Sequence, residues 1–194
     1  MKRQAEAMLP TDWGNFNMIA FADDESDKMP HLAIVHENFD NAKSVLLRIH
    51  SECMTGDLFH SHRCECGEQL DTAMKLASEQ GGIIIYLRQE GRGIGLINKL
   101  KAYKIQDTGV NTADANTHLG LEVDAREYNT AITIMKNLGI KKVKLLTNNP
   151  DKIAAIELSD IEVEKRIPLI IPPKKENHAY LKTKQDLMGH LFKI

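Results

Sequence analysis

The chain has 194 residues, of which 42% are hydrophobic and 27% charged, and its formal net charge is −2. This is the composition of a globular domain, which excludes disordered and fibrous classes, and the lack of a basic excess argues against nucleic acid as a partner. The polar N-terminus is unlike a secretion signal, and the longest apolar run, residues 83–87, is too short to cross a bilayer, so we expect a cytoplasmic protein without a membrane partner.

Periodicity predicts a strand-rich first third followed by alternating helices and strands. Apolar and polar residues alternate before Cys53, as in strands, whereas after Cys66 apolar residues recur at helical spacing until Gly81 ends the run. Residues 106–124 are polar and irregular, so we expect a functional loop there. The predicted elements are strands at 31–36 and 44–49, a helix from 66 to the glycines at 81–82, a strand at 83–87, helices at 94–105 and 128–138, a strand at 143–146, a helix from Pro150 and a strand at 161–167.

These elements predict one compact α+β domain, of mixed α/β character, over residues 1–172. The remaining residues, 173–194, start within the Pro172-Pro173 pair and are polar, with helical character in their last half. We expect this tail to be mobile in the free protein and to become ordered when substrate binds.

All three cysteines of the chain lie close together, as Cys53, Cys64 and Cys66. An odd number cannot form a complete disulfide framework, and in a reducing compartment clustered cysteines more often bind metal or take part in chemistry. Three thiolates leave one position of a tetrahedral zinc free, for water in a catalytic site or for a fourth protein ligand in a structural one. The spacing predicts zinc but leaves both kinds of site open, since three histidines are near in sequence: His50, His60 and His62.

Polar and basic residues flank these cysteines. The string Arg48-Ile49-His50-Ser51-Glu52 directly precedes Cys53, and Arg63 directly precedes Cys64. Guanidinium groups suit phosphate oxygens, and a carboxylate such as that of Glu52 accepts hydrogen bonds from a sugar or a base. A solvated strand end is the alternative, but adjacency to the cysteines favours a shared pocket.

Two further strings, Arg88–Gly93 and Thr147–Lys152, each connect a predicted strand to a predicted helix. Such turns present backbone N–H groups and the positive end of a helix to an anion. Neither string is a P-loop or a dinucleotide fingerprint, so ordinary turn and cap chemistry is the alternative. Asp124 and Arg126, near a helix start, are by residue type more often a cap and a surface charge than a catalytic pair, and Tyr103 is by default a packing residue.

Taken together, these strings resemble the GTP cyclohydrolase II family. The matching segments stand in the family's order from about residue 45 to residue 152, and weaker similarity reaches both ends. They are Arg48–Cys53, Arg63–Gly67, Arg88–Asn98, Ala102-Tyr103 with Gln106-Asp107, and Leu145–Pro150.

The resemblance implies a zinc-dependent hydrolase in which Cys53, Cys64 and Cys66 hold the metal. Its substrate would be GTP, accompanied by Mg²⁺, and its products 2,5-diamino-6-ribosylamino-4(3H)-pyrimidinone 5′-phosphate, formate and pyrophosphate, at the first step of riboflavin biosynthesis. The resemblance further implies the stand-alone form of the enzyme, without a fused dihydroxybutanone phosphate synthase domain, and a homodimer.

Individual roles follow from the same resemblance. Asp124 matches the proton acceptor, Arg126 the nucleophile toward the α phosphate, and Tyr103 a tyrosine near the base. A guanidinium with a pKa above about 12 is a poor nucleophile, so charge stabilisation is the easier role for Arg126. The residues that match GTP contacts are Arg48, Ile49, His50, Ser51, Glu52, Gln69, Glu90, Gly91, Arg92, Thr112, Thr147 and Lys152.

Three positions, Glu65, Asn111 and Ala125, depart from residues frequent in the family, and none of them is a proposed ligand or catalytic group. The alternative from another class is a non-catalytic guanine-nucleotide-binding protein with a structural zinc. That alternative requires a fourth protein ligand on the metal and gives no use to Tyr103, Asp124 and Arg126. A zinc hydrolase that stops after partial hydrolysis is a further alternative, which formate release would exclude.

Overall fold

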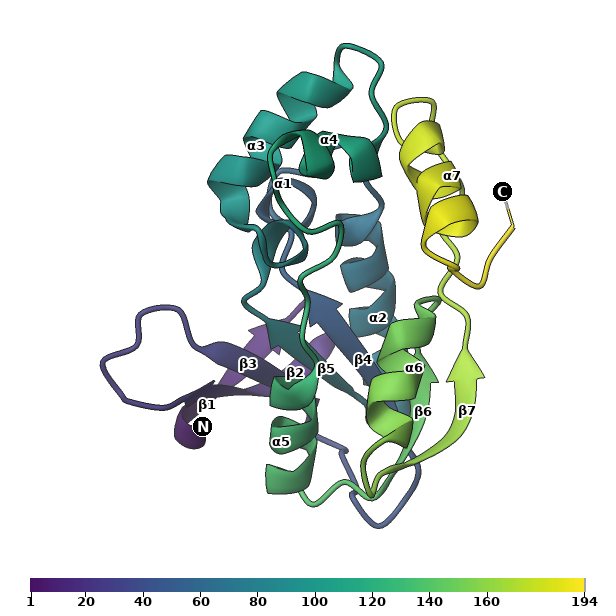
Figure 1. Ribbon diagram of the computed structural model, residues 1–194. Helices are drawn as coiled ribbons and strands as arrows, with labels where there is room; N and C mark the ends of the chain where they lie inside the picture. Colours follow the sequence, from purple (N-terminus) through teal and green to yellow (C-terminus); the bar gives the residue numbers. More distant parts are fainter. Residues whose placement is uncertain (194) are drawn as a thin grey trace.

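The structure is a computed structural model that describes residues 1–193, and it places one mixed sheet between helices (Figure 1). The strands are β1 (Lys2–Thr11), β2 (Gly14–Ala22), β3 (His31–His36), β4 (Val45–Ser51), β5 (Ile83–Leu87), β6 (Lys142–Leu146) and β7 (Glu162–Ile167). The helices are α1 (Met54–Asp57), α2 (Cys66–Gln80), the 3₁₀ turn η1 (Glu90–Gly93), α3 (Gly95–Gln106), α4 (Thr112–His118), α5 (Asn129–Asn137), α6 (Pro150–Glu157) and α7 (His178–Leu187). The predicted mixed α/β class is confirmed.

The seven-stranded sheet has the order β1-β2-β3-β5-β4-β6-β7. Strands β1, β2, β3 and β5 pair antiparallel, whereas β5, β4, β6 and β7 pair parallel. Parallel strands end at the same edge of a sheet, and ligands of such folds bind outside that edge. The segments that follow β4, β5 and β6, which contain Cys53, Glu90 and Thr147, therefore come together.

Strand alternation decides on which face of the sheet each side chain of β4 lies. Leu47 and Ile49 pack with α5 and α6 in the larger core cluster, whereas Leu46 packs on the opposite face with α2. Successive side chains of a strand point to opposite faces, so Arg48 and His50 share the face of Leu46. The polar residues of β4 thus lie on the side covered by α2.

Helix α2 confirms the predicted apolar spacing, because Ala73, Met74 and Ala77 are buried on one face. Gly81 ends the helix in the left-handed region, with φ 64°. A Cβ atom there would lie 2.5 Å from the carbonyl oxygen of Asn38, so glycine is required for both conformation and space.

The β1–β2 hairpin and the helices α1 and α4 were absent from the sequence-based expectation. The β1–β2 hairpin was not predicted strand by strand, because β1 is exposed along most of its length and lacks apolar alternation; its pairing with β2 stabilises it. The polar segment 106–124, expected to be a loop, contains α4. Asn111 caps this helix, since its side chain accepts hydrogen bonds from the backbone N–H groups of Ala113 and Asp114.

The chain end forms α7, in which Leu181 and Lys184 are buried. The mobility expected for residues 173–194 stays a prediction, and residue 194 lies outside the described residues. In residues 1–193, no helix has both the length and the apolar content needed to cross a membrane.

Candidate active site

A cavity lies at the edge where β4, β5 and β6 end. It gathers side chains that are far apart in the sequence, among them Arg48 from β4, Cys66 from α2, Tyr103 from α3, Thr147 after β6 and Lys184 from α7. Figure 1 shows α3, α4 and α7 grouped at this end of the sheet. The cavity is therefore enclosed by elements from both halves of the chain.

The three cysteines converge in this cavity. Cys53 precedes α1, Cys66 begins α2 and Cys64 lies two residues earlier, and the three sulfur atoms lie within 4.8 Å of one another. In a tetrahedral zinc site with Zn–S bonds of about 2.3 Å, two sulfurs are about 3.8 Å apart. The Cys53 and Cys64 sulfurs are 3.6 Å apart, so the donor set and its spacing fit zinc.

The surroundings favour thiolates at this cluster. The Lys99 ammonium donates to the Cys53 sulfur at 3.0 Å (Nζ to Sγ), and the start of α2 places a positive helix end at Cys66. Hydrogen bonds from the thiols of Cys64 and Cys66, together with Lys99, hold the pKa of Cys53 well below its ordinary value. In turn, the hydrogen bonds to Cys53 and its charge raise the pKa of the other two thiols. Metal binding would displace those protons, because thiolates are the ligands.

None of the nearby histidines completes the cluster. Within residues 1–193 the group that could hold a metal consists of the three cysteines. His50 is bonded to Asp57 instead, and His60 and His62 are exposed. The fourth position is therefore open to water or substrate, which favours a catalytic over a structural zinc site.

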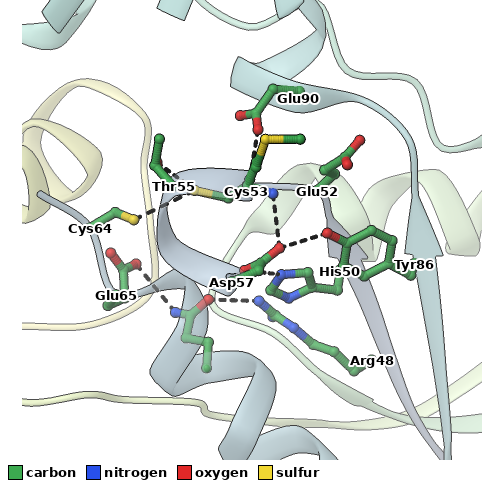
Figure 2. Close-up of polar contacts among 12 residues, drawn as sticks. Arg48, His50, Glu52, Cys53, Thr55, Asp57, Cys64, Glu65, Tyr86 and Glu90 are labelled. Carbon is green, nitrogen blue, oxygen red and sulfur yellow. Dashed lines mark hydrogen bonds and ion pairs between the residues drawn. The ribbon is translucent and has the colours of Figure 1, made fainter. Parts of the chain in front are cut away.

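Glu90 secures the cluster from the β5 side. Its carboxylate accepts from Lys99 Nζ at 2.7 Å with one oxygen and from the backbone N–H of Met54 at 2.6 Å with the other. Lys99 thus bridges Glu90 and the Cys53 sulfur. Figure 2 shows Glu90 beside Cys53, on the side opposite Cys64.

Asp57 connects the cysteine cluster to β4 and β5. Its buried carboxylate accepts from His50 Nε2 at 3.1 Å, from the Tyr86 hydroxyl at 2.8 Å and from the Cys53 backbone N–H at 2.9 Å (Figure 2). An ionised carboxylate only accepts, so we assign the ring hydrogen of His50 to Nε2, which leaves a lone pair on Nδ1. Burial lowers the pKa of His50, which keeps the ring neutral.

A second hydrogen-bonded chain joins β4 to the turn between Cys64 and Cys66. Arg48 Nη2 donates to Gln69 Oε1 at 2.7 Å, and Gln69 Nε2 donates to Glu65 Oε1 at 3.2 Å. Figure 2 shows Arg48 and Glu65, the two ends of this chain, below Cys53 and Cys64. It fixes the positions of a cation and a carboxylate next to the cysteine cluster.

The acidic side chains of the cavity wall are all held in ion pairs. The pairs are Glu52 with Arg88 at 2.6 Å, Glu65 with Lys184 at 2.6 Å and Glu90 with Lys99 at 2.7 Å. None of these carboxylates is left to neutralise the remaining cations of the wall.

Three cations of the wall, Arg48, Arg92 and Lys152, have no ion-pair partner among the residues that the structure describes. Arg48 bonds to the neutral amide of Gln69, and Lys152 Nζ donates to the carbonyl of Ile49 at 2.8 Å. Burial and the charges of neighbouring cations hold the pKa of Lys152 well below its ordinary value. Buried cations without counter-charge are costly, and a bound anion would remove that cost.

Unpaired polar atoms also concentrate at the cavity. A buried donor or acceptor without a partner is destabilising and uncommon, so such atoms often mark a ligand site. Within residues 1–193, four of these atoms belong to residues of the cavity wall: Arg48 Nε, His50 Nδ1, Glu65 Oε2 and Arg92 Nη2. They offer both donors and acceptors to a polar ligand.

Asp124 and Arg126 form a close ion pair. Arg126 Nε donates to Asp124 Oδ1 at 2.8 Å, and its Nη2 donates to the other oxygen. Burial alone would raise the pKa of Asp124, but the bonds and charge of Arg126 outweigh it, so the pKa is lowered. The same pairing raises the pKa of Arg126 against the effect of burial. Both groups are charged, and Arg126 lines the cavity.

Tyr103 stands next to the cysteine cluster. Its hydroxyl lies 3.4 Å from Thr55 Oγ1, which is 3.7 Å from the Cys53 sulfur. Burial raises the pKa of Tyr103 to about 12. At neutral pH the hydroxyl is therefore protonated and available as a hydrogen-bond donor.

Comparison with known proteins places this site in a family. The GTP cyclohydrolase II family model matches residues 2–168. A GTP cyclohydrolase-2 of Neisseria meningitidis is 52% identical over 188 residues, which cover 96% of this chain and 94% of the relative. The chain belongs to the GTP cyclohydrolase II family.

Longer relatives of the family also match. The riboflavin biosynthesis protein RibBA of Bacillus cereus is 48% identical over 193 residues, which are 99% of this chain and 48% of that protein. The chain therefore spans about half the length of these relatives. A two-domain 3,4-dihydroxy-2-butanone 4-phosphate synthase from A. baumannii has a TM-score of 0.47 at 17% identity, over 88% of this chain and 40% of that one, a similarity too low to support an inference.

Most residues predicted from the GTP cyclohydrolase II resemblance line the cavity. Ile49 does not, because its side chain is buried in the core and only its carbonyl takes part, as acceptor from Lys152. Asp124 lies beside the cavity wall and touches it through Arg126. The residues that do line it are Arg48, His50, Ser51, Glu52, Gln69, Glu90, Gly91, Arg92, Thr112, Thr147 and Lys152, with Tyr103, Arg126 and the three cysteines.

The cavity and its immediate surroundings also contain residues that were not predicted. Lys99 lies one helical turn before Tyr103 on α3, a spacing that could have signalled it. Asp57 follows Cys53 closely, but its bonds to β4 and β5 appear only in three dimensions. No local pattern marked the contributions of the chain end, which are Tyr180, Lys184, His190 and Phe192.

Proposed function

We propose that the chain hydrolyses GTP, with zinc, to 2,5-diamino-6-ribosylamino-4(3H)-pyrimidinone 5′-phosphate, formate and pyrophosphate, the first step of riboflavin biosynthesis. One observation carries the proposal: a single cavity joins an open three-thiol cluster to three cations that lack an ion-pair partner among the described residues. A metal cluster with an open position suits hydrolysis, and unpaired cations suit a polyphosphate. Family membership supports GTP as the nucleotide.

The cationic part of the wall would hold the triphosphate. Arg48, Arg92 and Lys152 present charge without a protein counter-ion, so phosphate oxygens would take that place. Arg126, fixed by both oxygens of Asp124, holds its guanidinium in one orientation. Charge that develops as the α–β phosphate bond breaks would be stabilised there, with Mg²⁺ on the triphosphate adding to the effect.

The cysteine side of the wall would hold the guanine. Zinc bound by Cys53, Cys64 and Cys66 would supply a Lewis acid that makes hydroxide available at neutral pH. The Tyr103 hydroxyl, protonated beside the cluster, would donate a hydrogen bond to the ring that is opened. His50 Nδ1 offers an acceptor to a donor of the base.

The test is a paired product assay on protein whose zinc content has been measured. Purified protein is incubated with GTP and Mg²⁺, and formate and pyrophosphate are quantified together, with and without a chelator. We expect equal amounts of both products and the loss of formate on chelation. The Cys64→Ser variant serves as the matched protein with a disrupted metal site.

The other outcomes point to different functions. Pyrophosphate without formate would indicate a partial hydrolase. GTP binding with neither product, on zinc-loaded protein, would indicate the nucleotide-binding alternative and refute the proposal. A homodimer in the cytoplasm is part of the proposal, and sedimentation equilibrium of the purified chain would test the dimer.

A further inference from the structure

The last helix forms part of the active-site wall. Helix α7 lies beyond residues 2–168, which the family model matches, yet Tyr180 and Lys184 on this helix line the cavity. Figure 1 shows α7 standing beside α4 and α2, at the end of the sheet where the cavity lies.

Lys184 is bound to the turn that carries two of the cysteines. Its Nζ lies 2.6 Å from Glu65 Oε1, and both side chains are nearly inaccessible, at 11% and 3% exposure. Glu65 is the residue between Cys64 and Cys66, so this ion pair ties the turn that carries both ligands to α7. A buried ion pair that loses one partner leaves a costly uncompensated charge, so Lys184 restrains this turn.

The restraint continues into the rest of the site. Glu65 Oε1 also accepts from Gln69, and Gln69 accepts from Arg48, so one chain of polar contacts runs from α7 to β4. Residues that hold metal ligands in place from outside the coordination sphere affect metal affinity. Glu65 is such a residue for Cys64 and Cys66.

Tyr180 keeps Lys184 in position. The Lys184 ammonium lies 4.5 Å from the centre of the Tyr180 ring, and the Arg92 guanidinium lies 5.5 Å from the same ring. Cations at these distances are attracted to an aromatic face. Tyr180 therefore ties α7 to Arg92, one of the cations without an ion-pair partner among residues 1–193.

We propose that Lys184 is a positioning residue of the metal site: through Glu65 it fixes the Cys64–Cys66 turn in the geometry that binds a divalent metal. The inference builds on the proposed function, which supplies the role of the metal. The positioning role can be tested separately from that function, because metal binding is measured without GTP.

The experiment titrates metal-free protein with Co²⁺ and follows the absorption bands of cobalt bound to thiolates. We compare the original chain with Lys184→Met, Lys184→Arg and, as matched control, Lys182→Met, which removes an exposed lysine of the same helix. We expect affinity to fall about 10-fold to 100-fold in Lys184→Met, with changed band positions, and to recover in Lys184→Arg. Lys182→Met should bind Co²⁺ as the original chain does.

A double-mutant cycle with Glu65→Gln separates positioning from general loss of structure. If Lys184 acts through Glu65, Lys184→Met should cause little further loss in the Glu65→Gln background. Far-UV circular dichroism and thermal unfolding of each metal-free variant show that it is folded. Unchanged Co²⁺ affinity and spectrum in folded Lys184→Met, or fully additive losses in the cycle, would overturn the inference.

The two proposals can fail separately. If the original chain releases no formate but Lys184→Met binds Co²⁺ weakly, the proposed function fails and the positioning role stands. If the original chain releases formate and Lys184→Met binds Co²⁺ normally, the positioning role fails and the function stands.

Discussion

A methyl group added at Gly56 should disable the metal site while leaving the fold in place. Gly56 is buried in α1, and a Cβ atom there would lie 2.8 Å from the Cys64 sulfur, 3.0 Å from Cys66 Cβ and 3.2 Å from the Cys53 sulfur. The φ of Gly56 is outside the left-handed region, so alanine can adopt its backbone. The unfavourable part of the Gly56→Ala effect thus comes from lack of space and not from backbone strain.

The magnitude follows from two opposing contributions. Overpacking a buried site costs about 1–3 kcal/mol, because side chains leave their preferred positions. Alanine is favoured over glycine in a helix by about 0.5–1 kcal/mol, which offsets part of that cost. Together these give a net loss of about 0–2.5 kcal/mol in the free energy of unfolding. The cysteines must separate to accept the methyl group, so zinc binding should fall far more than stability does.

The assay measures zinc per chain, the Co²⁺ spectrum and the denaturation midpoint of Gly56→Ala. The control is Leu58→Ala, at the end of the same helix, because Leu58 is 65% exposed and its truncation should leave all three measurements nearly unchanged. Stoichiometric zinc with an unaltered Co²⁺ spectrum in Gly56→Ala would refute the reasoning, since the sulfurs would then tolerate a methyl group between them.

Three further predictions concern the metal and the charges of the site. Cys64→Ser should lose zinc and, with it, formate release; formate from a zinc-free Cys64→Ser protein would contradict the metal mechanism. Arg126→Gln should lower turnover by about 10²–10³-fold, and Arg126→Lys should retain more activity because the positive charge remains. Equal turnover in the two variants would show that Arg126 does not act through its charge. The pKa of Lys152 is lowered in the free protein, and a bound anion should raise it. Binding of a non-hydrolysable GTP analogue should therefore add protons to Lys152. The affinity for the analogue should fall as pH rises from the pKa of Lys152 in the free protein to its pKa in the complex. Calorimetry in buffers of different ionisation enthalpy measures this uptake, and the same uptake in Lys152→Met would exclude Lys152 as its source.

Local patterns were sufficient for the elements that bury a regular stripe. The apolar spacing of α2 and the short β-branched run of β5 predicted both elements, because their side chains pack on one face or on both. The β1–β2 hairpin escaped prediction because β1 is mostly exposed, and its stability comes from pairing with β2 rather than from an apolar stripe. Helix α4 escaped because its polar sequence gives little periodicity, and its start depends on the cap at Asn111.

The residue types alone indicated the chemistry of the site. Three closely spaced cysteines predicted a metal, and the segments around them indicated the family. Whether a metal on these cysteines would be catalytic or structural was open in the sequence, because His50, His60 and His62 were all near. Tertiary structure decided against them as ligands, since His50 faces Asp57 and the other two are exposed.

The sequence by itself determined which groups are available: the thiols, the guanidinium and ammonium groups, and the glycines that allow close approach. Only the tertiary structure decided which groups meet, because the decisive contacts join residues that no local pattern connects. Lys184 reaches Glu65 across 119 positions, and Lys152 reaches the Ile49 carbonyl across 103. Such pairs form because the parallel strands end at one edge of the sheet and the last helix covers that edge, and packing of the whole chain sets this arrangement.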